Sequence, residues 1–439
     1  MEITGLSVAA GLVVVLGLIG VPIAFTLGIA GFAGLVLSQG LLSANMYIQL
    51  TPFWTTYGYT LSLVPLFILM GNLLGATDII FNVFRLLQRT LVRVRGGIGY
   101  VVVILSTVFA ASSGSTLAAC GVFAPLTLPT MMQLGYDKSF SAGCIASAAT
   151  VAVMIPPSIT MVIYAMITET PVGPLLIAGI IPGLLNSAMY ALTIFVLVTL
   201  KPDLAPAGNR NRGGVERVSW GGAIFSFSAI SVIVITVIGG MYSGILTPSQ
   251  AGGAGAFVAF LAYLVKRTNG KETGLLPIFT EVGTMTAVIF IILIGALIFA
   301  RFLQLSGFIN FFIDFVKGLS LPALAIIFII AFIYLILGQF LDAMSMLMLT
   351  LPLFFPLVVE LGYNSIWFGV LVVQLVEIGN LTPPLGLNVF TVSTATRGAI
   401  TPEEVFKGVT PFIITCLVLV IMIIFVPSIA LWLPSRMNS

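Results

Sequence analysis

Small polar residues able to bind an ion interrupt an otherwise apolar part of the chain. The sequence ASSGSTLAACG places hydroxyl groups and a flexible backbone at Ser112, Ser113, Gly114, Ser115 and Thr116. If a helix starts here, its free N–H groups suit an anion, and neighbouring hydroxyl and carbonyl oxygens suit a hard cation. The stretch therefore predicts an ion or anion site, with a small-residue patch for helix packing as the alternative.

A second polar interruption, LGQFLDAMS, carries a carboxylate. Asp342 lies between Gly338 and Ser345 within a long apolar run. A carboxylate at membrane depth is costly, which favours a role as a cation ligand or polar gate. The alternative is that Asp342 caps the helix that follows, and the two roles are compatible.

Two proline pairs break apolar segments, Pro156-Pro157 in MIPPS and Pro383-Pro384 in LTPPL. Proline removes a backbone donor and breaks a helix, which leaves carbonyl oxygens free to face an ion. Thr382 and Asn388 add side-chain oxygens beside the second break. A proline kink that only shapes the helix is the alternative.

Glu377 precedes the second proline pair by one to two helical turns. An ionisable residue at this depth is expected to have a function, but its spacing leaves three interpretations open. It is a cation ligand, a proton carrier, or the partner of a polar neighbour.

The composition places all these residues in a membrane. Hydrophobic residues make up 59% of the chain, charged residues make up 7%, and the mean hydropathy is +1.20. Successive apolar spans of about 20 residues predict transmembrane helices, because helices satisfy their own backbone hydrogen bonds in lipid. The chain has no histidine and three well-separated cysteines, which argues against a Cys/His metal site and an enzyme active site.

The apolar pattern predicts ten crossings and two re-entrant hairpins. The hairpins fall at 97–133 and 321–357, and each enters and leaves on the same side. The crossings fall at 4–20, 22–40, 61–77, 137–168 with a break, 173–200, 220–240, 248–265, 284–301, 363–395 with a break, and 405–433.

An internal repeat relates the two halves of the chain. A shift of 227 residues superposes APLTLP on LPLFFP, LGYD on LGYN, and MIPPS on LTPPL. Five crossings in each half would turn the second copy upside down, as in many secondary transporters. The sequence thus predicts two inverted repeats, 1–200 and 220–439, joined by a cytoplasmic linker at 201–219.

The positive charges agree with this topology. With the segment after residue 77 in the cytoplasm, fourteen of the 17 Lys and Arg residues are cytoplasmic, and only Arg301, Lys317 and Arg436 lie outside. Both termini would then be on the outer face, and the hairpin tips would approach each other near mid-membrane. Helices at the membrane surface are expected at the basic stripe around Arg89, at 41–60 and at 266–283.

At this point the sequence resembles a known family. The runs GVPIAFTLGIAGF, VPLFILMGNLL, SSGSTLAACGVFAPLTLP and LDAMSMLMLTLPLFFPLVVELGYNSIWFGVLVVQLVEIGNLTPPLGLNVF are similar to signatures of the large membrane subunit of tripartite ATP-independent periplasmic (TRAP) transporters. The resemblance implies a multi-pass protein of the bacterial inner membrane that imports a small organic anion, a carboxylate or sulfonate. It also implies coupling to two or more sodium ions and an elevator motion of a transport domain against a scaffold.

The resemblance further implies partners and site residues. The partners are a separate small four-helix membrane subunit and a periplasmic substrate-binding protein. Sodium ligands are expected at Ser112, Gly114, Ser115, Val151, Met154, Pro156, Gly338, Asp342, Gly379 and Thr382, with Asn380 also near the second site. Substrate contacts are expected at Ser113, Ser115, Thr116, Pro157 and Asn388. Two other readings stay open: a stand-alone dicarboxylate or proton-coupled carrier of the same architecture, and a channel or membrane scaffold.

Overall fold

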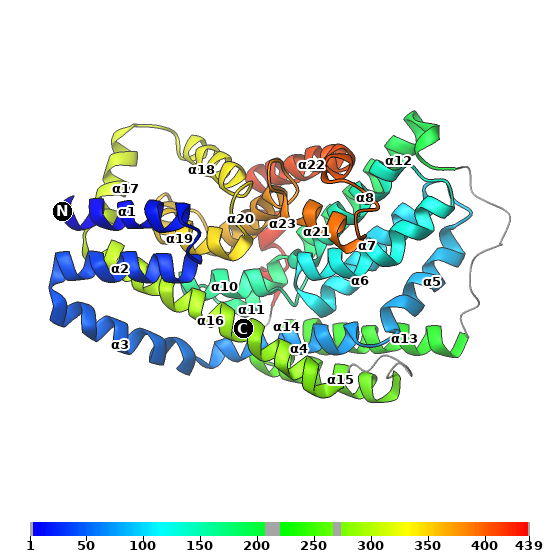
Figure 1. The fold of residues 1–439 in the computed structure, drawn as a ribbon, viewed down its shortest axis with the longest axis horizontal. Helices are drawn as coiled ribbons and strands as arrows, with labels where there is room; N and C mark the ends of the chain where they lie inside the picture. Colours follow the sequence, from blue (N-terminus) through cyan, green and yellow to red (C-terminus); the bar gives the residue numbers. More distant parts are fainter. Residues whose placement is uncertain (1–2, 207–219, 267–273, 438–439) are drawn as a thin grey trace.

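The computed structural model describes residues 3–206, 220–266 and 274–437, and the regular structure within these ranges is entirely helical. The first half contains α1 (Ile3–Leu18), α2 (Ile23–Gln39), α3 (Leu41–Tyr57), α4 (Leu63–Gly75), α5 (Ile79–Leu91), α6 (Gly97–Ser113), α7 (Thr116–Gln133), α8 (Lys138–Ala149), α9 (Val151–Met154), α10 (Ile159–Thr168), α11 (Val172–Ala178) and α12 (Ile180–Leu200). Figure 1 shows these helices in blue to green.

The second half contains α13 (Trp220–Val234), α14 (Gly240–Tyr242), α15 (Pro248–Lys266), α16 (Leu275–Leu305), α17 (Phe308–Gly318), α18 (Ala323–Leu337), α19 (Ala343–Glu360), α20 (Ser365–Gly379), α21 (Leu387–Ala395), α22 (Pro402–Phe425) and α23 (Ser428–Leu431). Six described helices, or pairs of consecutive helices, are long and apolar enough to cross a bilayer. Two further pairs, α3 with α4 and α8–α9 with α10, qualify as bent spans. The chain is therefore a multi-pass membrane protein.

The residues that the sequence predicts as hairpin turns do separate helices. Gly114 and Ser115 lie between α6 and α7, and Gly338 to Asp342 lie between α18 and α19. Gly114 adopts a positive φ of 58°, which glycine accepts without steric cost. Ser115 and Asp342 then cap the returning helices α7 and α19 with their side chains.

The proline pairs break helices as expected. Residues 155–158 separate α9 from α10, and residues 380–386 separate α20 from α21. The first broken segment bends by 44° between Lys138–Met154 and Ile159–Thr168. Ser158 restarts the helix as the cap of α10, accepting a hydrogen bond from the Met161 N–H at 3.2 Å.

The prediction of a separate surface helix at 266–283 was wrong. Lys266 ends α15, and residues 267–273 lie outside the described residues. The rest of the segment leads into α16, which continues without a break to Leu305 and so also exceeds the predicted 284–301 span. Pro277 is tolerated because it lies in the first turn, where its missing N–H would be unpaired. In the first half, Gly58 separates α3 from α4, and the two helices meet at a bend of 58°.

The final crossing is also shorter than expected. We expected a span at 405–433, but α22 ends at Phe425. Pro427 follows closely, and proline cannot continue the hydrogen-bond ladder of a helix.

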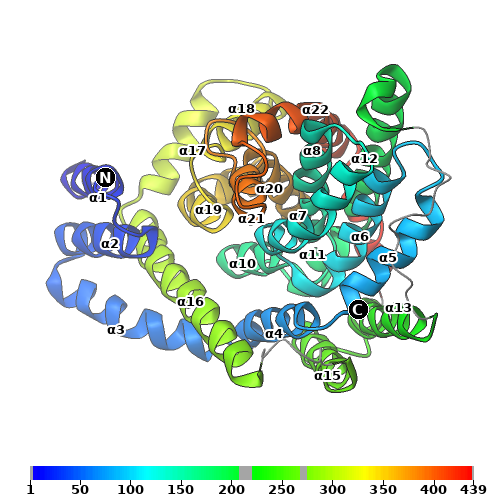
Figure 2. The same ribbon diagram turned by 45° about the vertical axis from the view of Figure 1, so that its right-hand side comes forward.

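Small residues allow two close helix crossings that hold the fold together. An added Cβ at Gly295 of α16 would lie 2.1 Å from the carbonyl oxygen of Ala24 in α2. On the other side of the molecule, an added Cβ at Gly143 of α8 would lie 2.2 Å from the backbone of Gly408 in α22. Backbones approach this closely in membranes only where the side chains are small. In Figure 2, α16 runs obliquely from α2 toward α4.

Candidate functional site

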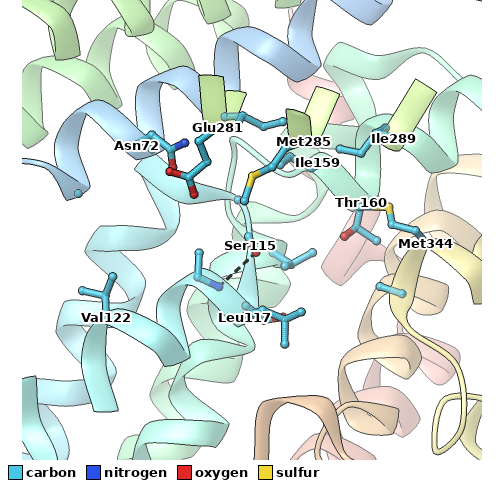
Figure 3. A pocket seen from close by; sticks show the side chains of 18 of the residues that line it. Asn72, Ser115, Leu117, Val122, Ile159, Thr160, Glu281, Met285, Ile289 and Met344 are labelled. Carbon is cyan, nitrogen blue, oxygen red and sulfur yellow. Dashed lines mark hydrogen bonds between the residues drawn. The ribbon is translucent and has the colours of Figure 1, made fainter. Parts of the chain in front are cut away.

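A cavity of about 750 Å³ lies where the hairpin turns and the broken helices come together. One wall is formed by α4 and α16. The other walls come from the starts of α7 and α19 and from both helix breaks, through Val153, Ile159, Glu377 and Asn380. Figure 3 shows Ser115 at the start of α7, with Asn72 and Glu281 on the α4 and α16 side and Met344 of α19 beyond Thr160.

The first hairpin turn reaches the cavity and packs on the first helix break. Gly114, Ser115 and Thr116 all line the cavity. An added Cβ at Gly114 would lie 2.5 Å from the Pro157 carbonyl oxygen, so the turn and the proline pair are in backbone contact. The Ser115 hydroxyl accepts a weak hydrogen bond from the Ala118 N–H at 3.4 Å. The arrangement leaves the start of α7 facing the cavity.

The second hairpin turn reaches the same cavity through Asp342. The Asp342 Oδ2 atom accepts hydrogen bonds from the N–H groups of Met344 at 3.1 Å and Ser345 at 3.2 Å. Its Oδ1 atom accepts a hydrogen bond from the Ser345 hydroxyl. The carboxylate thus caps α19 while it lines the cavity.

We expect Asp342→Ala to lower the free energy of unfolding by about 1 kcal/mol, because the first N–H groups of α19 lose their acceptor. Asp342→Asn retains a cap oxygen and is expected to unfold like the wild type. Thermal unfolding of the purified protein in detergent measures both. Equal melting of the alanine and asparagine variants would show that the cap contributes nothing.

The second hairpin also contacts the second helix break through two glycines. An added Cβ at Gly379 would lie 2.5 Å from the Cα atom of Gly338. An added Cβ at Gly338 would lie 2.9 Å from the Cα atom of Gly379. Both glycines are buried and neither lines the cavity. They therefore place the turn before α19 directly on the end of α20.

Several predicted ligands lie near the cavity without lining it. Val151, Met154, Pro156 and Pro157 are buried and absent from the cavity wall, and Asn388 is fully buried. An added Cβ at Gly179 would lie 2.1 Å from the Met154 carbonyl oxygen, so that carbonyl lies against the junction of α11 and α12. Thr382 donates its hydroxyl hydrogen to the Ile378 carbonyl at 2.6 Å. The side chains of Ser112 and Ser113 lie outside the described part of the structure.

The reasoning from sequence missed the polar residues on the α4 and α16 wall. Asn72 and Glu281 line the cavity, and the Asn72 Nδ2 atom is buried without a hydrogen-bond partner. Thr160, at the start of α10, was missed as well. The one available signal was the presence of single polar residues within apolar helices.

The charge of the cavity wall is negative. Glu281, Asp342 and Glu377 line it, and no Lys or Arg occurs among the described residues that do so. An anionic ligand in this cavity would therefore depend on the N-terminal ends of α7, α10 and α19, or on bound cations.

Comparison with known proteins identifies the family. The model of the DctM component of tripartite ATP-independent periplasmic transporters matches residues 10–429. The chain belongs to this family. The C4-dicarboxylate TRAP transporter large permease protein DctM of Pseudomonas aeruginosa is 30% identical, covering 93% of this chain and 94% of that protein.

Other TRAP permeases are nearly as similar. The sialic acid TRAP transporter large permease protein SiaM of Vibrio cholerae is 28% identical over 94% of this chain and 95% of its own. The ectoine TRAP transporter large permease protein TeaC of Halomonas elongata is 28% identical over 84% of this chain and 85% of its own. The crystal structure of the Alcanivorax borkumensis YdaH transporter shares the fold, with a TM-score of 0.61 and 12% identity. The match covers 87% of this chain and 88% of that one.

Proposed function

We propose that this TRAP permease is the large membrane subunit of a sodium-driven importer of a small organic anion, a carboxylate or sulfonate, in the bacterial inner membrane. The observation that carries the proposal is the cavity, which both hairpin turns and both helix breaks border. Interrupted helices that meet in this way present helix N-termini and free carbonyl oxygens to a solute and its coupling ions. The relatives named above are C4-dicarboxylate, sialic acid and ectoine permeases, and an isethionate permease of Oleidesulfovibrio alaskensis is 28% identical, which supports the solute class.

The residues present fit two sodium sites of hard oxygen donors. The first would use Gly114 and Ser115, with Ser112 and the carbonyls near Pro156, because Gly114 lies in contact with Pro157. The second would use Gly338, Asp342, Gly379 and Thr382, which the Gly338 to Gly379 contact brings together. Bound sodium supplies positive charge next to a cavity whose described wall has none.

We further propose ten crossings arranged as two inverted repeats, with both termini on the periplasmic side. The helix breaks and hairpin turns recur in the two halves at equivalent positions, which supports this arrangement. The proposal includes an elevator motion, which the position of the cavity between the α4 and α16 wall and the hairpin turns supports. If the hairpins and broken helices slide as one body along that wall, the cavity moves from one side of the membrane to the other.

The proposal includes two partners, a small four-helix membrane subunit and a periplasmic protein that delivers the solute. Proteoliposomes containing both membrane subunits test it directly. Uptake should require the binding protein and an inward sodium gradient. Uptake without the binding protein would favour a stand-alone carrier, and uptake driven by a pH gradient alone would contradict sodium coupling.

We expect Ser115→Ala and Thr382→Ala each to raise the half-saturating sodium concentration for uptake about 5- to 30-fold. Each change removes one oxygen ligand, worth about 1–2 kcal/mol in a buried site. Thr199→Ala is the matched control, because the exposed Thr199 hydroxyl makes the same type of bond, to the Phe195 carbonyl at 2.7 Å. Unchanged sodium activation in both site variants would contradict the assigned ligands.

A further inference from the structure

Glu377 is a buried carboxylate beside the cavity whose oxygens make no hydrogen bond of normal geometry. Its side chain is 1% exposed. It lines the cavity, where no described wall residue carries a positive charge. An ionised carboxylate removed from water in this way is strongly unfavourable, so the group either takes up a proton or is compensated by a cation.

Polar side chains lie near Glu377, and two of them, Asn380 and Asn388, have side-chain oxygens without a hydrogen-bond partner. Asn380 lies one turn further along the same helix, is 3% exposed, and has an unpartnered Oδ1 atom. Thr116, at the start of α7, is the second polar neighbour of the carboxylate. Asn388 of α21 is held nearby, because its N–H donates to the Asn380 carbonyl at 3.1 Å, and its carboxamide has no partner.

We propose that Glu377, with the side-chain oxygens of Asn380, Asn388 and Thr116, binds a sodium ion at a site separate from the two at the hairpin turns. The inference rests on the proposed sodium coupling and adds a third ion to it. The donors are all hard oxygens, and a single carboxylate balances a single positive charge. A divalent ion fits less well, since no group of three or more His, Cys, Asp or Glu side chains occurs in the described ranges.

The proposed site lies next to both turn sites along the chain, since Thr116 follows Ser115 and Asn380 follows Gly379, but it uses different donor atoms. The turn sites depend on the backbone contacts of Gly114 with Pro157 and of Gly338 with Gly379. The Glu377 site instead joins Thr116, in the first half of the chain, to α20 in the second half. Sodium bound there would hold the first hairpin against the second broken helix, so both halves would take part in one ion site.

Equilibrium binding of radioactive sodium to the purified protein in detergent tests the inference, alongside the sodium-dependent rise in melting temperature at constant ionic strength. Glu377→Gln keeps the shape of the side chain and removes its charge. We expect it to bind one sodium ion fewer per chain than the wild type. Glu403→Gln, which removes an exposed carboxylate outside the cavity, is the matched control and should bind the wild-type number.

The outcomes separate this inference from the proposed function. A wild-type protein that neither binds sodium nor is stabilised by it would overturn sodium coupling itself. Wild-type stoichiometry and affinity in Glu377→Gln would overturn only the third site. If Glu377→Gln does not fold, Glu377→Asp decides: at least a fivefold weaker affinity for one sodium ion supports the site, and unchanged affinities overturn it.

Discussion

Gly408→Ala is expected to prevent stable folding of the protein. The added Cβ would lie 1.8 Å from the carbonyl oxygen of Ser139 and 3.1 Å from the Cα atom of Gly143. Backbone atoms of α8 cannot rotate away as a side chain can, so α8 and α22 would have to separate. Overpacking typically costs about 1–3 kcal/mol, and a clash between two helix backbones belongs at or above the upper end of that range.

Fluorescence-detected size-exclusion chromatography and thermal unfolding in detergent measure the effect. Gly121→Ala is the control, because an added Cβ at this helical glycine meets no atom within 4 Å. The control should match the wild type or be slightly more stable, since alanine favours a helix over glycine. A Gly408→Ala protein as stable as the control would show that the two helices can move apart at little cost.

Gly379→Ala is expected to abolish transport while leaving the protein folded. The added Cβ would lie 2.5 Å from the Cα atom of Gly338 and 2.7 Å from its carbonyl carbon and oxygen. The turn before α19 must then move away from the end of α20 by several tenths of an ångström or more. Metal–ligand distances tolerate only about 0.2 Å, so the second sodium site should lose its geometry. We expect uptake to fall at least about 10-fold, a change of about 1.4 kcal/mol.

Uptake into proteoliposomes, with the amount of folded protein measured in parallel, tests this expectation. Gly283→Ala is a suitable control, because this α16 glycine is exposed and an added Cβ meets nothing within 4 Å. Normal sodium-dependent uptake by Gly379→Ala would mean that the close contact between hairpin and helix break has no part in ion binding.

The helix breaks and turns could be predicted because their chemistry is local. Proline pairs interrupt a helix wherever they occur, and Ser115 and Asp342 are residue types that favour helix starts. Both residues do cap helices and line the cavity. The repeat added the expectation that the two turns meet, and the shared cavity agrees with it.

Other parts of the site depend on tertiary structure, and their pattern in the sequence is weak. The chain has 45 glycines, and nothing local distinguishes Gly379, which touches another backbone, from Gly121, which touches none. Asn72 and Glu281 occur in apolar helices whose cavity-facing sides are set only by packing. The continuity of α16 was missed because the repeat suggested a break there, as between α3 and α4.

The two charged residues near the ends of α16 locate the cavity relative to the lipid. Glu281 and Arg301 are 20 residues apart on one uninterrupted helix, a rise of about 30 Å, which equals the usual thickness of the hydrocarbon layer. Both side chains are exposed, so each can reach a headgroup region. If α16 crosses the bilayer along its axis, the Glu281 wall lies at the edge of the hydrocarbon layer. A solute leaving the cavity past Glu281 would enter water with no lipid left to cross.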